Sequence, residues 1–189
     1  ALWLSAESIR NNLFQAQVEL FSAKQPDNAQ AAFDSAESHV ISALEIYQDG
    51  FESSIDTVAP HINQLILEKF DMAAQYSQTG DAIQLANVRG EIWTALLWAS
   101  YDMAVHEVNA ENIDSARAWL TIREFRQSTR VSMVDNVADQ VLNLLENGDV
   151  KPTTALLEIE NDLRDTYLYR LRFSLEEVKI ALDKGFQIR

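Results

Sequence analysis

The sequence predicts an all-α fold, an antiparallel bundle of about seven helices around a buried central helix, within a single domain spanning residues 1–189. Three observations support this prediction. The 189 residues include only five glycines and three prolines, and the β-branched residues are scattered rather than grouped into alternating runs. Hydrophobic residues make up 47% of the chain, which is enough for one sizeable core. The stretch Glu91 to Val108 is apolar on nearly every side of a helix.

This central stretch reads EIWTALLWASYDMAVHEV. Its apolar residues occupy several helical faces, among them Ile92, Trp93, Leu96, Leu97, Ala99 and Met103. Asp102, His106 and Glu107 interrupt the run well before the ~20 apolar residues that a membrane span requires. We therefore expect a buried rod inside a soluble domain. Trp98 and Trp119 lie at core spacing and are expected to pack rather than to form a ligand cage.

Two helices are predicted in the N-terminal part of the chain. The first runs from Leu2 to Lys24, because apolar residues recur at helical spacing, and Pro26 follows its end. The second begins at Asp27, which forms a capping-box pattern with Gln30 three residues later. Gly50 suits the left-handed position that closes a helix, so we expect the second helix to end there.

The next two helices have clear start and stop signals. Pro60 is expected in the first turn of the third helix, with Thr57 or a neighbour as its cap, because proline is tolerated there. Gly80 closes that helix and Asp81 caps the next one. The central helix is then predicted over residues 82–109.

Three further helices are predicted in the C-terminal part. The first is capped by Asn112 or Asp114. The second is rich in valine and leucine and ends near Gly148. The last is long and follows Pro152 to about Lys184.

The composition excludes several classes of function. A formal net charge of -14 argues against nucleic acid as a partner and fits a cation, a basic partner or solubility alone. The chain has no cysteine, so disulfides, thiolate metal sites and thiol nucleophiles are excluded. It opens at Ala1 without the features of a signal peptide, although a cleaved signal stays open.

One stretch of the chain is basic. Arg117, Arg123, Arg126 and Arg130 cluster in the fifth predicted helix, and the last three share one helical face. They can bind an anionic partner or pair with carboxylates of neighbouring helices. Internal pairing is favoured, because carboxylates are in large excess.

The first candidate metal ligands lie on the central helix. Asp102 and His106 are one turn apart and can face one point in space, with Glu107 and Glu111 nearby. The alternative is that Asp102 is a buried or half-buried acid that hydrogen-bonds neighbouring side chains.

A second candidate set lies in the most acidic part of the chain. Asp49, Glu52 and Asp56 offer oxygen ligands, which suit hard cations. They share one face only if helix continues across Gly50, and Gly50 argues against that continuation. The alternative is an ordinary solvated face.

The sequence contains none of the common catalytic patterns. Glu-x-x-His, His-Glu-x-x-His, a phosphate-binding glycine loop and Gly-x-Ser-x-Gly are all absent. We therefore predict no enzymatic activity and no catalytic residue.

Two segments of the chain resemble a known family. The run DSARAWLTIREFRQSTR, from Asp114 to Arg130, is similar to the extracytoplasmic helical segment of long bacterial members of the high-affinity iron permease family. The segment from Glu160 to Phe186 resembles the long helix that follows it, and Thr79 to Val105 is compatible with the helix before it. Ala1 to Gln78 resembles the family only in its acidic helical character.

The family's iron-handling motif is Arg-Glu-x-x-Glu within membrane helices. Arg123 and Glu124 match its first two residues, but Gln127 replaces the last glutamate, so the permeation role is not transferred to them.

The resemblance implies a non-enzymatic accessory domain of an iron permease. It would lie outside the cytoplasmic membrane, tethered to it or free, with the membrane domain of the permease as its partner in cis or trans. Iron is the one cofactor that the resemblance suggests, held weakly through carboxylates and histidine. The alternative is a helical protein-binding scaffold with no metal role.

Overall fold

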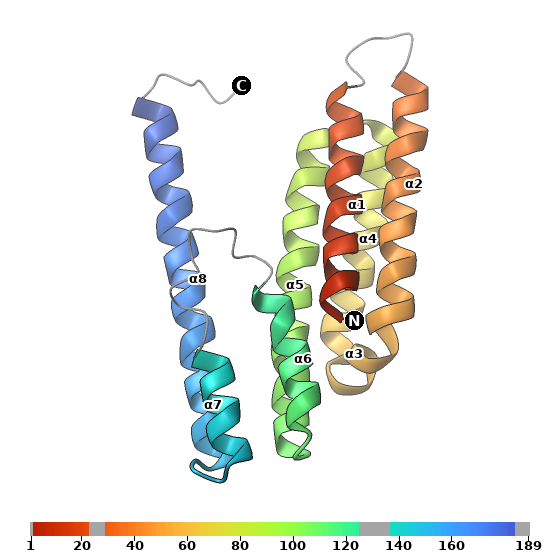
Figure 1. Cartoon of the computed structure of the whole chain (residues 1–189). Coiled ribbons are helices and arrows are strands. Elements are labelled where there is room, and N and C mark those ends of the chain that lie inside the picture. Colours follow the sequence, from red (N-terminus) through yellow and green to blue (C-terminus); the bar gives the residue numbers. More distant parts are fainter. Residues whose placement is uncertain (1, 23–28, 125–136, 184–189) are drawn as a thin grey trace. The chain divides into compact units, whose positions relative to one another are not determined.

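The computed structural model describes residues 2–22, 29–124 and 137–183 (Figure 1). These residues form no strand and eight α-helices with one π-helical turn: α1 (Leu2–Ser22), α2 (Ala29–Tyr47), η2 (Gln48–Glu52, the π turn), α3 (Ser53–Val58), α4 (Pro60–Thr79), α5 (Ala82–Asn109), α6 (Ile113–Glu124), α7 (Val137–Glu146) and α8 (Pro152–Asp183). The all-α prediction is confirmed. The helix that the sequence analysis did not separate is α3.

The contacts divide the chain into two compact units, residues 1–127 and residues 128–189. The single domain spanning residues 1–189 stays a prediction. In the first unit, α1 packs on α2, α2 on α4, α4 on α5, and α5 again on α1. These four helices form an antiparallel bundle, with α6 alongside α5 and α1 (Figure 1). This arrangement agrees with the predicted bundle.

Burial of α5 organises the first unit. Twelve of its residues are buried, from Leu85 to Val108, as predicted for the central rod. Each fully buried leucine or isoleucine contributes about 1.5–3 kcal/mol relative to an exposed one. Trp98 was expected in the core but is 52% exposed. Helical spacing explains this difference, because Trp98 lies two turns after Glu91 on the exposed side of α5.

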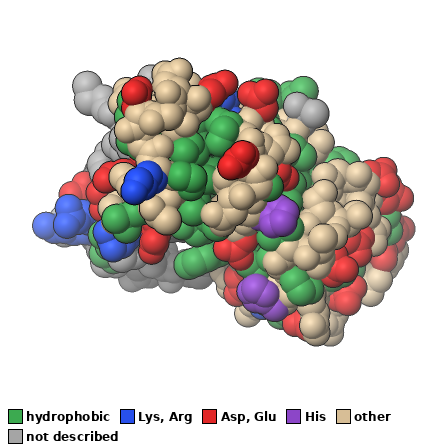
Figure 2. Space-filling view, turned by 90° about the horizontal axis from the view of Figure 1, so that it is seen from below, with side chains coloured by type: hydrophobic (Ala, Val, Ile, Leu, Met, Phe, Trp, Pro, Cys, Tyr) green, Lys and Arg blue, Asp and Glu red, His purple; other side chains and the backbone are tan. Residues whose placement is uncertain are grey.

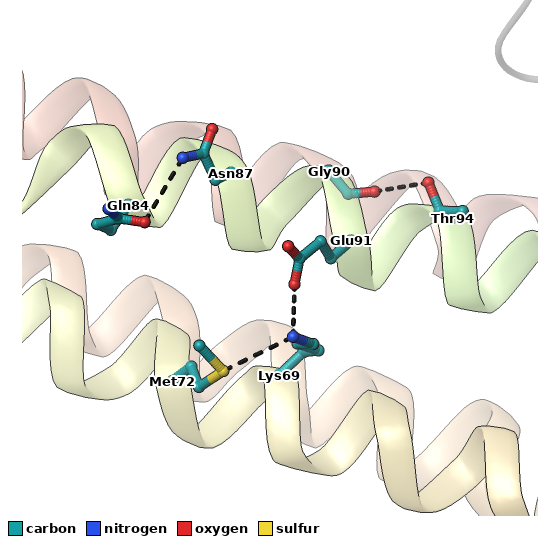
Figure 3. A network of polar contacts seen from close by, with 7 residues as sticks. All are labelled: Lys69, Met72, Gln84, Asn87, Gly90, Glu91 and Thr94. Atoms are coloured by element: carbon teal, nitrogen blue, oxygen red, sulfur yellow. Dashed lines mark hydrogen bonds and ion pairs between the residues drawn. The ribbon is translucent and has the colours of Figure 1, made fainter.

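Apolar packing, rather than ion pairing, joins α4 to α5. The ion pair that the structure describes between α4 and α5 links Lys69 Nζ to Glu91 Oε2 at 2.6 Å. Lys69 Nζ also lies 3.8 Å from the Met72 sulfur (Figure 3). The Glu91 side chain is 52% exposed. A pair this exposed contributes less than about 1 kcal/mol, whereas Ile66 and Phe70 of α4 are fully buried.

The turn between α4 and α5 follows its sequence signals. Gly80 has φ 74°, and its N–H donates to the Ser77 carbonyl at 3.4 Å. The Asp81 N–H donates to the Tyr76 carbonyl at 3.0 Å, which completes the hydrogen-bond pattern of a Schellman motif. The Asp81 side chain accepts a hydrogen bond from the Gln84 N–H at 3.0 Å, as expected of an N-cap.

The prediction that Gly50 closes the second helix is wrong. The helix continues through the π turn η2 into α3, and Gly50 is not among the glycines with positive φ. Burial favours the continuation, because the continuous helix places Phe51 and Ile55 in the core, where they are 1% and 0% exposed. A π turn accommodates one extra residue while the helix goes on.

Thr57 does not cap the helix that contains Pro60. Its hydroxyl donates to the Ser53 carbonyl at 2.9 Å inside α3. The residue at the N-cap position of α4 is Ala59, without a side-chain cap, and Pro60 follows in the first turn as predicted.

The second unit contains a helical hairpin. α7 and α8 pack on each other, with Val141 and Leu142 of α7 and Ala155 and Ile159 of α8 buried. Gly148, with φ 77°, ends α7 as predicted. Its N–H donates to the Leu145 carbonyl at 3.0 Å, and the Asp149 N–H donates to the Leu144 carbonyl at 2.8 Å.

Two glycine-to-alanine changes test the helical path through Gly50. At Gly80 a Cβ would lie 2.5 Å from the Phe33 ring at a positive φ, so Gly80→Ala should lower the unfolding free energy by at least about 1–2 kcal/mol. At Gly50 a Cβ would lie 3.7 Å from Ser5, which is ordinary contact. Gly50→Ala should therefore raise the unfolding free energy by about 0.5–1 kcal/mol, measured by urea denaturation. Equal losses in both variants would show that Gly50 ends the helix after all.

Candidate functional site

The continuation of helix through Gly50 places the second predicted acidic set on consecutive turns. Asp49 is exposed in η2, Glu52 is half-buried at its end, and Asp56 is exposed in α3. Glu52 and Asp56 are four residues apart, so their side chains lie on the same side of the helix. The end of the first unit that contains α3 presents acidic and histidine side chains among apolar ones (Figure 2).

A buried hydrogen-bond chain leads to one of these carboxylates. The Tyr47 hydroxyl donates to Asn63 Oδ1 at 2.5 Å, and Asn63 Nδ2 donates to Asp56 Oδ1 at 2.9 Å. Tyr47 and Asn63 are 1% and 4% exposed. The chain joins α2, α4 and α3, and it orients the Asp56 carboxylate from inside the core.

The electrostatics of Tyr47 show that both carboxylates lie near its phenol. Burial raises the Tyr47 pKa most, and the negative charges of Glu52 and Asp56 raise it further. The phenol therefore stays protonated and remains a donor to Asn63. A cation beside Glu52 and Asp56 would offset the charges that act on the phenol.

Aromatic rings hold this site against the core. The Tyr47 ring centroid lies 6.2 Å from that of Phe51 and 5.8 Å from that of Phe70. The Phe51 centroid in turn lies 5.9 Å from that of Trp119 on α6. These distances are typical of favourable aromatic pairs. The Tyr47 ring is therefore packed in an aromatic cluster that includes Trp119.

The first predicted metal set lies at the C-terminal end of α5. Asp102 and Glu107 are half-buried, whereas His106 and Glu111 are exposed. Within residues 2–22, 29–124 and 137–183, no group of three or more His, Asp or Glu side chains is placed to hold one metal ion. The assignment of ligands in either set stays a prediction.

Comparison with known families adds the identity of the chain. The model of the iron permease FTR1 N-terminal domain matches residues 1–189. The chain belongs to this family. The match confirms the resemblance inferred from the sequence and extends it over the N-terminal helices. No curated protein and no solved structure matches the chain.

Among the described residues of this iron permease domain, no helix is long and apolar enough to cross a membrane. Of the predicted partner-binding arginines, Arg117 is half-buried on α6. The Arg123 side chain, Arg126 and Arg130 lie outside the described residues, so the basic face stays a prediction.

Sequence reasoning missed Tyr47 and Asn63 as part of the site. Tyr47 lies at helical spacing among the apolar residues of the second predicted helix, so nothing in the sequence marks it for a polar role. Only a polar residue on the buried side of the Pro60 helix, at an otherwise apolar position next to Ile62, hinted at a partner in the core.

Glu111 closes α5 in an unusual way. It has φ 59°. Within the part of the chain that the structure describes, it is the one residue other than glycine with a positive φ. Its N–H donates to the Val108 carbonyl at 3.1 Å, and the Asn112 N–H donates to the Glu107 carbonyl at 2.8 Å. This is the same hydrogen-bond pattern as at Gly80, so the iron permease domain has a glutamate where glycine is favoured.

Glu111→Gly should stabilise the domain by about 1 kcal/mol, because glycine adopts this backbone conformation without the steric cost of a Cβ. Urea denaturation measures the change. Glu111→Ala is the control, which removes the carboxylate but keeps the Cβ and should leave stability nearly unchanged. Destabilisation by Glu111→Gly would mean that the carboxylate itself holds the turn.

Tyr47→Phe should lower the unfolding free energy near pH 7 by about 1–3 kcal/mol, because Asn63 Oδ1 loses its buried donor. The raised Tyr47 pKa stabilises the fold fully below the unfolded value of about 10, and this contribution is lost as pH rises above it. The difference between the two proteins should therefore narrow above about pH 10. Denaturant titrations at several pH values measure this, with Tyr76→Phe at a half-buried tyrosine of α4 as control. If the difference in unfolding free energy between the unchanged protein and Tyr47→Phe does not change with pH, the link between the Tyr47 pKa and stability is wrong.

Proposed function

We propose that this chain is a non-enzymatic accessory domain of an iron permease, exposed outside the cytoplasmic membrane and tethered to it or free. In this proposal the domain gathers iron weakly through carboxylates and presents it to the membrane domain of the permease, in cis or in trans. The observation that supports it most is the family match over residues 1–189.

The charge of the chain supports iron as cargo. The formal net charge is -14, so the domain attracts cations from solution. Carboxylate oxygens are hard ligands that suit hard cations. Glu52 and Asp56 are one helical turn apart, and the negative charges of both raise the pKa of the buried Tyr47 phenol. Two carboxylates with water in the remaining positions bind weakly, which fits a domain that must release its iron.

Asp102 and His106, with Glu107 or Glu111, are the second proposed ligand set. Their support is the one-turn spacing of Asp102 and His106 on α5. The Glu52 and Asp56 set has the stronger support, because Asn63 orients one of its carboxylates from the core.

The rival function is a helical scaffold that binds another protein without metal. The exposed hydrophobic side chains of α1, which include Phe14 and Phe21, favour it. A protein-binding surface on α1 does not by itself decide between the two functions, since a domain that delivers iron must also contact its permease.

Calorimetric titration with ferrous and ferric iron tests the metal role, with calcium and zinc as comparison ions. We expect saturable iron binding that weakens at least about tenfold, or 1.4 kcal/mol, in the Glu52→Gln/Asp56→Asn variant. These changes keep the shape of both side chains, and the amide introduced in place of Asp56 still offers an oxygen that accepts from Asn63. The Asp102→Asn/His106→Asn variant is the matched comparison and should lose less.

A folded domain without saturable iron binding would contradict the metal role and favour the scaffold. Loss confined to the Asp102→Asn/His106→Asn variant would move the site to the end of α5.

A further inference from the structure

The exposed side of α1 differs from the rest of this acidic protein. Its large exposed hydrophobic side chains are Trp3, Leu4, Phe14, Val18 and Phe21. Its other exposed residues are Ser8, Asn11, Gln15 and Ser22, and the charged residues of α1, Glu7, Arg10 and Glu19, are half-buried. Phe14, Val18 and Phe21 are spaced by four and three residues and form one stripe along the helix. We call these three residues the α1 stripe.

Positive charge borders the α1 stripe. The Arg89 guanidinium, which comes from α5, lies 5.2 Å from the centroid of the Phe14 ring. Arg10 lies one turn before Phe14 and is paired with Glu7 at 3.3 Å. Arg10 is close enough to Arg89 that its charge, after burial, lowers the Arg89 pKa. With the half-buried Glu19, the charges of Glu7, Glu19, Arg10 and Arg89 balance here, in a chain whose formal net charge is -14.

Arg89 lacks a carboxylate partner within the described part of the chain. It is half-buried, and within the described ranges its guanidinium contacts the Phe14 ring but no acidic side chain within ion-pair distance. Half-burying an arginine beside a second arginine is unfavourable unless an anion comes from elsewhere. With such an excess of carboxylates, an internal partner would be easy to supply. Among the described residues no carboxylate meets this guanidinium, so Arg89 can pair with a carboxylate that approaches the α1 stripe.

The α1 stripe and the arginines beside it together indicate the kind of partner that would bind. An apolar stripe with spacing of four and three residues matches the apolar face of another helix. An anionic lipid surface fits poorly, because the strongly acidic domain is repelled from it. A free phosphate would use the arginines but not the stripe.

We infer that the α1 stripe with Arg89 and Arg10 docks an amphipathic helix of the permease partner, whose apolar face covers Phe14, Val18 and Phe21 and whose carboxylate pairs with Arg89. This inference rests on the proposed function, since it names the surface that meets the permease. Phe14 and Phe21 supply aromatic anchors of the kind enriched at interfaces. The pairing of Arg89 fixes the register of the docked helix.

Co-purification of the tagged domain with a co-expressed full-length iron permease tests this. Val18→Asp places a charge in the centre of the stripe and should reduce the retained permease at least about tenfold. Ile41→Asp is the matched control, because Ile41 of α2 is 47% exposed and Val18 is 40% exposed. It should retain the permease as the unchanged domain does. Circular dichroism and thermal melting confirm that both variants are folded.

The arginine requires its own test. Arg89→Gln should weaken retention several-fold, and Arg89→Lys should restore most of it, because the ion pair needs the charge. A photo-crosslinking residue at Phe14 should join a helix of the permease within one turn of an Asp or Glu. Exchange of the charges, with Arg89→Glu on the domain and lysine at that acidic position, should recover binding.

The outcomes separate the two claims. If the unchanged domain retains the permease and Val18→Asp retains it equally, the docking surface is wrong and the proposed function stands. If the unchanged domain retains none, both are wrong. Flotation with phosphatidylglycerol vesicles or dimerisation in sedimentation, each lost in Val18→Asp, would replace the helix partner by a lipid surface or by a second copy.

Discussion

Burial of α5 is the constraint on which the first unit depends. A helix that is apolar on most of its sides is unstable in water, so α1, α4 and α6 must cover it. The exposed ion pair between Lys69 and Glu91 adds little to this packing. The positions of the other helices, and of the polar groups between them, follow from the need to cover α5 while leaving the side that contains Glu91 and Trp98 in solvent.

Core packing also decides the path of the chain at Gly50. The local signal favours a helix end there, but the helix continues and buries Phe51 and Ile55. The π turn is the result, and it brings Glu52 and Asp56 beside Tyr47 and Asn63. The acidic side chains of Glu52 and Asp56 thus gather next to Gly50, where core packing overrides the local preference for a helix end. The proposed iron site at Glu52 and Asp56 depends on the helix continuing through Gly50.

The sequence predicted features that depend on neighbours along the chain and missed those that depend on neighbours in space. The rod from Ala82 to Asn109 and the Gly80–Asp81 turn were predicted correctly, because apolar periodicity and caps are local signals. The link from Tyr47 through Asn63 to Asp56 joins residues up to 16 positions apart, and no pattern announces it. The contact between Arg89 and Phe14 likewise requires α5 to pack on α1. Asp102 and His106 were predicted as ligands from their one-turn spacing, with Glu107 and Glu111 nearby, and this assignment stays a prediction.

The central claim is that the continuous helix through Gly50 places the Glu52 and Asp56 carboxylates where they bind iron in this iron permease domain. Anomalous diffraction at the iron absorption edge, on crystals of the domain grown with iron, tests it most directly. The account predicts an anomalous peak within coordination distance of the Glu52 and Asp56 carboxylates, with Tyr47 and Asn63 hydrogen-bonded behind them. A peak beside Asp102 and His106, or no peak in crystals grown at saturating iron, would contradict it.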